Sequence, residues 1–265
     1  MSGTRHTLPA VAAAHPPASP NDSFPGERRA PAAAVDHDAG TGSVLPILLL
    51  PGWAHPAEAL QPLADILGRG RPVRVSGDIP VMEERCILAG WSLGGLRAIA
   101  AASRQPDRVA ALVLVSSTAR MTAAPGFPAG VPARQLQSMR IALRRDAERM
   151  LREFFIQAAY PETPGLTRLD ERIRAAVALG PDRLAAGLDV LLHTDLREAY
   201  VSLPSPCLIL HGGQDRIIPA AAADWMLHNH PGAREHRWPE AGHSLPLQQA
   251  AAVAGVIEQF LAGLG

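Results

Sequence analysis

Six short, mostly apolar runs recur along the chain and alternate with helical patterns. Runs of this length and composition are typical of strands that are covered on both faces, as in parallel sheets. Parallel neighbours need a crossover connection, usually a helix, and the crossover is right-handed. The sequence therefore predicts an open α/β sheet, mostly parallel, with helices on both faces. The predicted strands are residues 46–50, 73–75, 86–89, 109–115, 207–210 and, less distinctly, 235–238.

One interval, residues 119–203, breaks this alternation. It opens with a segment rich in Pro and Gly, continues as an arginine-dense helical stretch over 134–159, and carries further helix through Leu196. Helices inserted between two core strands form a lid, and we expect their apolar face to roof a site at the carboxyl ends of the strands. The remaining predicted helices are residues 94–104, 221–228 and 247–261.

The length and composition of the chain predict one catalytic domain preceded by a leader. The 265 residues are 47% hydrophobic, enough for one substantial core over residues 45–265. Residues 1–44 are rich in Ala, Pro, Ser, Gly and Asp and lack apolar periodicity, so we expect them to form a disordered leader.

Charge and cysteine usage narrow the functional class. The 25 basic residues balance the 25 acidic ones, which argues against a protein that coats nucleic acid or an anionic membrane. Neither a run of about 18 apolar residues nor a secretory signal is seen, so cytoplasmic residence is expected. Cys86 and Cys207 each open an apolar run, where a thiol is a small buried hydrophobe. We expect neither a disulfide framework nor a metal site.

The segment from Gly90 to Gly95 is the candidate nucleophile site. Gly-Trp-Ser-Leu-Gly-Gly follows a predicted strand and opens a predicted helix, the setting of a Gly-x-Ser-x-Gly nucleophile elbow. The turn strains the serine backbone and requires small residues two positions before and after it. Ser92 is therefore the predicted nucleophile, and the amide of Leu93 a predicted oxyanion donor. The alternative is a serine that only caps the helix.

A second oxyanion donor is expected after the first strand. Leu50-Pro51-Gly52-Trp53 occupies that place, and the backbone amide of Trp53 is the candidate. The alternative is that its indole only fills the core.

The candidate base is His243, on a loop after the last strand region. An imidazole can take the serine proton and return it to the leaving group. The order serine, acid, histidine along the chain favours His243 among the ten histidines. His55, close to the oxyanion loop, is the rival.

The candidate acid is Asp215, which a glycine turn presents after the strand that begins at Cys207. Its carboxylate would accept the imidazole N–H and stabilise the imidazolium. An aspartate that only caps the turn is the alternative reading. Asp189 and Asp195 are the other candidates, but a lid is a poor platform for an orienting group.

These segments together resemble the α/β-hydrolase superfamily, and within it the pimeloyl-carrier-protein methyl ester esterases of biotin synthesis (BioH). The resemblance covers the chain from about Leu48 to its end. It is carried by Gly90 to Gly95, by Gly212 to Pro219 followed by Ala-Gly-His-Ser, and by residues 187–197. It implies an α/β-hydrolase fold reduced to about six strands, with a helical lid.

The resemblance also implies an activity and its partners. The substrate would be the methyl ester of pimeloyl bound through phosphopantetheine to acyl carrier protein, hydrolysed without a cofactor. Substrate contacts would come from Trp53, Trp91, Leu93 and Phe154. Trp91 and Phe154 would line the acyl channel, the alternative being that both are core residues. The acidic carrier would meet arginines of the lid, unless these form only a solvated face: Arg149, Arg152, Arg168 and Arg172.

The chain departs from the family at two places. Family members usually have His-Gly before the oxyanion tryptophan, whereas this chain has Pro51 before Gly52, and proline offers neither that side chain nor a backbone N–H. The stretch between Trp53 and Ser92 has room for only one helix and one strand. We therefore expect a trimmed sheet and a more open pocket.

Two other functions fit the same residues. One is a carboxylesterase or lactonase that acts on free small molecules, which differs in partner and not in chemistry. The other is a hydrolase-like scaffold that binds a ligand without turnover, and covalent labelling of Ser92 by a fluorophosphonate would exclude it.

Overall fold

A fully parallel, six-stranded sheet lies at the centre of the described part of the chain, with strand order β2-β1-β3-β4-β5-β6. In this computed structural model residues 44–79 and 81–264 are described, so the expected leader, 1–44, lies outside them except for its last residue. Each predicted run is a strand: β1 (Ile47–Leu50), β2 (Val73–Val75), β3 (Cys86–Trp91), β4 (Val109–Val115), β5 (Cys207–Gly212) and β6 (Ala233–Trp238).

The burial of each strand follows its place in the sheet. Every residue of β3 and β5 is buried, as their continuous apolar sequence predicts for strands covered on both faces. The edge strands β2 and β6 alternate between exposed and half-buried positions. This alternation explains why β6, rich in charged residues, gave the weakest signal in the sequence.

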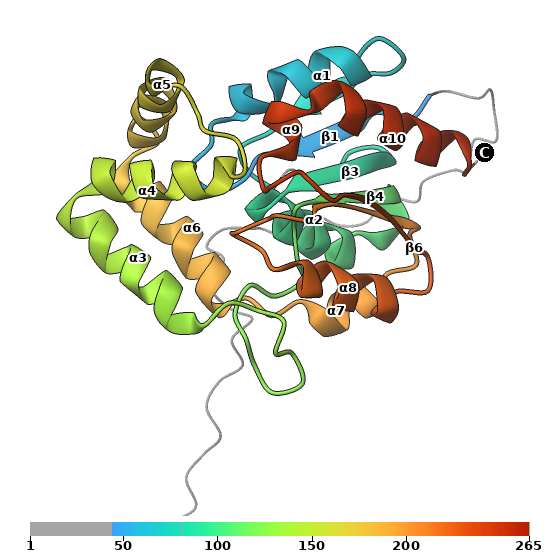
Figure 1. The fold of residues 1–265 in the computed structure, drawn as a ribbon. Coiled ribbons are helices and arrows are strands. Elements are labelled where there is room, and N and C mark those ends of the chain that lie inside the picture. Colours follow the sequence, from blue (N-terminus) through green and yellow to red (C-terminus); the bar gives the residue numbers. More distant parts are fainter. Residues whose placement is uncertain (1–43, 80, 265) are drawn as a thin grey trace, which may run out of the picture. The chain divides into compact units, whose positions relative to one another are not determined.

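Helices cover both faces of the sheet and build two apolar layers (Figure 1). On one face, β1 and β3 pack against α1 (Gln61–Leu67) and α10 (Ala250–Ala262). On the other face they pack against α2 (Leu93–Arg104) and α8 (Ala220–Asn229). The short elements are η1 (Ala57–Leu60), η2 (Pro106–Arg108), α7 (Arg197–Val201) and α9 (Leu245–Gln248).

The insertion between β4 and β5 has an apolar core of its own. Its main helices are α3 (Ala133–Arg145), α4 (Ala147–Ala159), α5 (Leu166–Val177) and α6 (Pro181–His193), grouped to one side of the sheet in Figure 1. Their inner faces pack on Trp53, Leu93 and Leu96, which follow strands β1 and β3. The insertion, called the lid below, therefore rests on the carboxyl edge of the sheet.

Two predicted helices are each divided in the structure. The stretch 134–159 breaks at Asp146, whose extended backbone ends α3 and whose carboxylate accepts the amide N–H of Arg149 to cap α4. An aspartate at this position competes with the helix ladder and favours a cap. The stretch 247–261 likewise breaks at Gln249, between α9 and α10. Apolar periodicity continued across both breaks and so did not reveal them.

Candidate active site

Ser92 stands on a sharp turn between β3 and α2, with φ of 55° and ψ of −119°. This left-handed conformation is strained for a residue with a side chain and needs the surrounding structure to hold it. The Ser92 amide donates to Val115 O at 2.9 Å, and the Ser117 hydroxyl donates to the Ser92 carbonyl at 2.8 Å. The strained elbow expected from the sequence is present. Ser117 was missed, since nothing near it in the sequence marks its partner.

Glycines around Ser92 allow three segments to meet. A Cβ at Gly90 would collide with the backbone of Gly94, and one at Gly94 would collide with the carbonyls of Leu50 and Pro51. The elbow thus packs directly against the loop that follows β1. The requirement for small residues on both sides of the serine follows from these backbone contacts.

The side chains of Ser92, His243 and Asp215 form one continuous hydrogen-bonded path. His243 Nδ1 lies 2.8 Å from Asp215 Oδ2, and His243 Nε2 lies 3.0 Å from Ser92 Oγ. Because a carboxylate only accepts, Nδ1 carries the proton, so Nε2 is free to accept the Ser92 hydroxyl proton. All three groups are buried, and Ser92 is 8% exposed. This arrangement can generate a serine nucleophile and stabilise the imidazolium that forms.

Asp215 is held by a tight turn. Its Oδ1 accepts the amide N–H groups of Ile217 and Ile218 at 2.8 and 2.9 Å, so the carboxylate has a fixed orientation. Burial alone would raise the pKa of Asp215, but attraction to His243 and the hydrogen bonds it receives hold this pKa below its ordinary value. His211, whose Nε2 donates to the Ile218 carbonyl, closes the same turn. The carboxylate therefore remains charged at neutral pH.

The loop that carries Trp53 lies beside Ser92, which directly precedes Leu93. Gly52 lies so close to Ser92 that a Cβ on it would approach Ser92 Cβ to 3.3 Å. Among the described residues neither the Trp53 amide nor the Leu93 amide donates a hydrogen bond. Free amides beside a nucleophile are what an oxyanion hole requires. The presence of Pro51 therefore does not keep this loop away from Ser92.

The model of the alpha/beta hydrolase family matches residues 34–256. The chain belongs to this family. It is similar to proteins named pimeloyl-[acyl-carrier protein] methyl ester esterase. The relative from Aromatoleum aromaticum is 32% identical over 194 residues, 70% of this chain and 77% of that protein. The one from Neisseria meningitidis serogroup C is 33% identical over 179 residues, 67% of this chain and 70% of that protein.

Solved structures agree on the fold. An esterase from Exiguobacterium antarcticum has a TM-score of 0.74 at 18% identity, covering 84% of this chain and 93% of its own. At this identity the likeness establishes the architecture alone. The α/β-hydrolase fold expected from the sequence is thereby confirmed.

Two tryptophans of the hydrolase have different surroundings. Trp53 Nε1 donates to Leu184 O of the lid at 2.8 Å, and the Phe154 ring packs edge-on against Trp53 with centroids 4.8 Å apart. Trp91 instead is 2% exposed, lies in the layer beneath α1 and α10, and donates to the His243 carbonyl at 2.9 Å. The expectation that Trp91 lines the acyl channel is therefore corrected. It belongs to the core and supports the histidine loop.

A cavity of about 530 Å³ opens between α3, α4 and the turn after Asp215. Phe154 is in its wall, with Met139, Met150 and Ile217. Because Phe154 also contacts Trp53, this cavity is adjacent to the oxyanion loop. Arg134, Gln135, Ser138, Glu153 and Gln157 also line it, so its wall combines apolar and polar surface.

The rival groups have other partners. His55 Nδ1 donates to Trp53 O at 2.9 Å, and burial lowers the pKa of His55 to about 3, so it is neutral and supports the loop. Asp189 pairs with Arg140 at 2.7 Å. Asp195 binds Arg120 and Arg197 where the two ends of the lid meet. These contacts leave His243 and Asp215 as the pair that reaches Ser92.

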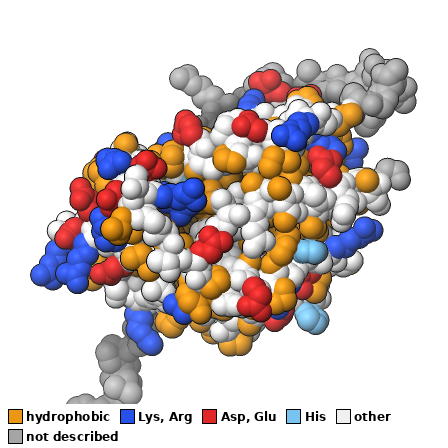
Figure 2. All heavy atoms as spheres, turned by 45° about the horizontal axis from the view of Figure 1, so that its top comes forward, with side chains coloured by type: hydrophobic (Ala, Val, Ile, Leu, Met, Phe, Trp, Pro, Cys, Tyr) orange, Lys and Arg blue, Asp and Glu red, His pale blue; other side chains and the backbone are white. Residues whose placement is uncertain are grey.

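The four arginines expected to meet a carrier protein divide into two pairs. Arg149 contacts Glu153 at 3.2 Å and Arg152 contacts Asp170 at 2.8 Å. No ion pair is found for Arg168 or Arg172 within residues 44–79 and 81–264, and burial together with the nearby Arg168 charge lowers the pKa of Arg172. On the left of Figure 2, where α3–α5 lie, basic and acidic side chains are interspersed. The surface is mixed in charge, and of these four arginines only the two on α5 lack an ion pair within the described residues.

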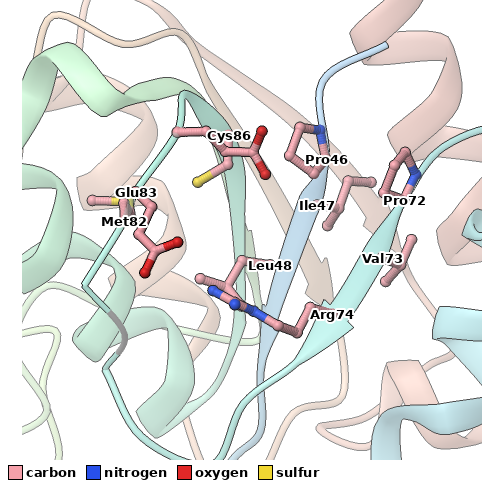
Figure 3. Close-up of a pocket in the computed structure, with 10 residues that line it drawn as sticks. Pro46, Ile47, Leu48, Pro72, Val73, Arg74, Met82, Glu83 and Cys86 are labelled. Atoms are coloured by element: carbon pink, nitrogen blue, oxygen red, sulfur yellow. The ribbon is translucent and has the colours of Figure 1, made fainter. Parts of the chain in front are cut away.

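A second cavity, of about 170 Å³, lies at the opposite end of the sheet. Figure 3 shows it at the amino ends of β1, β2 and β3, with Leu48, Arg74 and Cys86 around it. The carboxyl ends of these strands carry the candidate site, so this cavity is separate from it. Cys86 and Cys207 are buried free thiols.

The described residues offer neither a metal site nor a membrane span. They contain no group of three His, Cys, Asp or Glu side chains arranged to hold a metal ion. None of their helices combines the length and apolarity needed to cross a bilayer.

Proposed function

We propose that this hydrolase is a serine carboxylesterase that removes the methyl group from the pimeloyl ester carried by acyl carrier protein, in biotin synthesis. The observation that carries ester hydrolysis is the path from Ser92 through His243 to Asp215, with contacts of 3.0 and 2.8 Å. The choice of ester rests on the similarity, at 32–33% identity, to the esterases of that name.

The reaction takes two steps. Ser92 Oγ gives its proton to His243 Nε2 and attacks the ester carbonyl, while the amides of Leu93 and Trp53 hold the developing oxyanion. The C–O bond to the methoxy group breaks, and His243 returns the proton to release methanol. Water then attacks the acyl enzyme by the same route, and the free carboxylate leaves. Asp215 stabilises the imidazolium in both steps.

The acyl group would occupy the cavity beside Phe154. The walls formed by Met139, Met150 and Ile217 are apolar, whereas the reacting carbonyl would lie against the polar amides near Ser92. An extended acyl chain buries its methylenes in such a cavity at a gain of about 0.8 kcal/mol each. The long chain therefore contributes binding that a short ester lacks.

The carrier would meet the outer face of α4 and α5. Arg168 is exposed and lies one turn from Arg172, so this part of the surface presents positive charge to an acidic partner. Attraction of this kind increases the rate of encounter more than the final affinity. We propose cytoplasmic residence on the same basis, because the carrier-bound substrate would be met there.

A free small-molecule ester or lactone is the second candidate substrate. It is favoured by the pairing of Arg149 with Glu153 and of Arg152 with Asp170, since paired arginines offer less charge to a carrier. The chemistry at Ser92 would be unchanged.

Growth and kinetics together test the proposal. The chain should restore growth without biotin to a strain that lacks its own pimeloyl-carrier esterase, and Ser92→Ala should not. In vitro, kcat/KM should be at least tenfold higher for the carrier-bound methyl ester than for methyl pimelate free in solution. Equal values for the two esters would favour the small-molecule esterase. Absence of fluorophosphonate labelling at Ser92 would remove the enzymatic reading altogether.

A further inference from the structure

The C-terminal end of lid helix α4 lies against the segment that carries His243. Ser244 Oγ donates to the Ala158 carbonyl at 2.8 Å, and Gln248 Nε2 donates to the Ala159 carbonyl at 2.9 Å. Carbonyls in the last turn of a helix have no partner within the helix. Two side chains from the histidine segment therefore cap α4, across 86 and 89 residues of sequence.

A third contact extends this junction to the next residue of the lid. Gly242 lies so close to the Tyr160 carbonyl that any Cβ would collide with it. Ala158, Ala159 and Tyr160 thus meet the His243 segment through successive carbonyls. The two segments have no room to slide past one another.

The acid side of the site touches the same end of α4. The guanidinium of Arg216, the residue after Asp215, lies over the Tyr160 ring, 3.1 Å from its centroid. The helix also carries Phe154, which packs against Trp53 of the oxyanion loop. One lid helix therefore contacts the segments that present the base, the acid and an oxyanion donor.

The junction lies next to the catalytic histidine, whose distance from Ser92 Oγ matters for proton transfer. Ser244 is bonded directly to His243, whose Nε2 must stay 3.0 Å from Ser92 Oγ. A displacement of about 1 Å at a reacting group can reduce the rate by about a hundredfold. Ser244 is buried, and removing its hydroxyl would leave the Ala158 carbonyl without this partner.

We propose that Ser244 and Gln248 are positioning residues that fasten the His243 loop to the end of α4, so that the placement of the base depends on the seating of the lid. The inference rests on the proposed ester hydrolysis but not on which ester is hydrolysed. A ligand or partner that shifts α4 would alter turnover through this junction.

The test compares two serines that make the same bond. Ser205 is also buried, and its Oγ donates to Val109 O at 2.9 Å, at the amino ends of β4 and β5. Ser244→Ala and Ser205→Ala therefore remove equivalent hydrogen bonds, one at the lid junction and one remote from the site. For each we would measure kcat and KM with p-nitrophenyl acetate, the rate of fluorophosphonate labelling, and the midpoint of urea unfolding.

Ser244→Ala should lower kcat and the labelling rate about tenfold or more with KM nearly unchanged, whereas Ser205→Ala should shift only the unfolding midpoint. Ser244→Thr keeps the hydroxyl and should recover most of the kcat. Equal kcat in the two alanine variants would overturn the proposal. If Ser244→Ala does not fold, Gln248→Ala at a half-buried position replaces it, and an unchanged kcat there has the same consequence.

The labelling rate separates this inference from the proposed function. Fluorophosphonate needs only a reactive Ser92, so the junction can be tested even if the wild-type protein hydrolyses no ester. Turnover of p-nitrophenyl acetate without any activity on the pimeloyl ester would refute the proposed substrate alone.

Discussion

The indole N–H of Trp91 donates a 2.9 Å hydrogen bond to the backbone carbonyl of His243. The residue beside the candidate nucleophile thus holds the loop of the candidate base. The His243 loop is therefore held by two elements: strand β3, through Trp91, and lid helix α4, through the contact of Ser244 with Ala158. The imidazole is positioned by the sheet as well as by the lid.

Replacing Trp91 with phenylalanine keeps an aromatic ring but removes the N–H donor, together with part of the volume that the buried indole fills. We expect kcat for p-nitrophenyl acetate to fall about fivefold to tenfold and the free energy of unfolding to fall by about 1–3 kcal/mol, since a buried carbonyl loses its partner. Steady-state kinetics and urea titration measure the two effects. An unchanged kcat would show that this bond does not place the base.

Gly94→Ala should disable the site through the backbone. The new methyl group would collide with the carbonyls of Leu50 and Pro51, so either the elbow or the oxyanion loop must move. We expect kcat to fall at least a hundredfold and stability to fall by about 1–3 kcal/mol. Gly255 in α10 has open space where its Cβ would stand, so Gly255→Ala should retain kcat and gain up to about 1 kcal/mol. Similar kinetics in the two variants would contradict the argument.

Because His55 is buried in its neutral form, the free energy of unfolding should decrease as the pH falls below neutral. Burial lowers its pKa from 6.5 to about 3, so between these values the unfolded chain binds a proton that the folded chain does not. Stability from His55 is therefore present above pH 6.5 and is lost as pH falls toward 3, at up to about 1.4 kcal/mol per pH unit.

The variant His55→Gln tests this linkage. Urea unfolding between pH 4 and 7 should show a shallower dependence on pH than in the wild type, although His211, whose pKa burial also lowers, still contributes. Serine labelling should persist in His55→Gln and be lost in His243→Gln. Loss of labelling in His55→Gln would make His55 a candidate base again.

Charge reversal on α5 should affect carrier-bound substrate alone. Arg168 is exposed, and no ion pair is found for it in the described part of the chain, so Arg168→Glu should raise KM for the carrier-bound ester about fivefold to tenfold at low salt. Kinetics with p-nitrophenyl acetate should not change. Arg85→Glu, exposed at the amino end of β3, is the matched control and should alter neither substrate. Equal effects of the two reversals would argue against a docking surface on α5.

Local patterns were sufficient for the sheet and for the residues of the candidate site. The strands could be predicted because parallel strands buried on both faces need continuous apolar sequence, as in β3 and β5. Ser92, Asp215 and His243 could be predicted because each follows a strand in a turn of recognisable chemistry. The break at Asp146 was missed because apolar periodicity continues through it.

Contacts between distant residues are the part that sequence patterns do not contain. Its residue type marks Trp91 as largely apolar, but nothing in Gly-Trp-Ser says that its ring packs in the layer under α1 and α10 or that its N–H meets a carbonyl 152 residues away. The pairing of Arg152 with Asp170 and the bond from Ser244 to Ala158 are equally invisible in sequence.

The amino-acid sequence alone determined which segments become strands, which residue types stand at their carboxyl ends, and hence the chemistry available there. Only the tertiary structure decided which of these groups touch, which tryptophan supports a loop, and how the lid contacts the base. The physical reason is range: propensity and turn chemistry act over a few residues, whereas packing joins atoms that are near in space and remote along the chain.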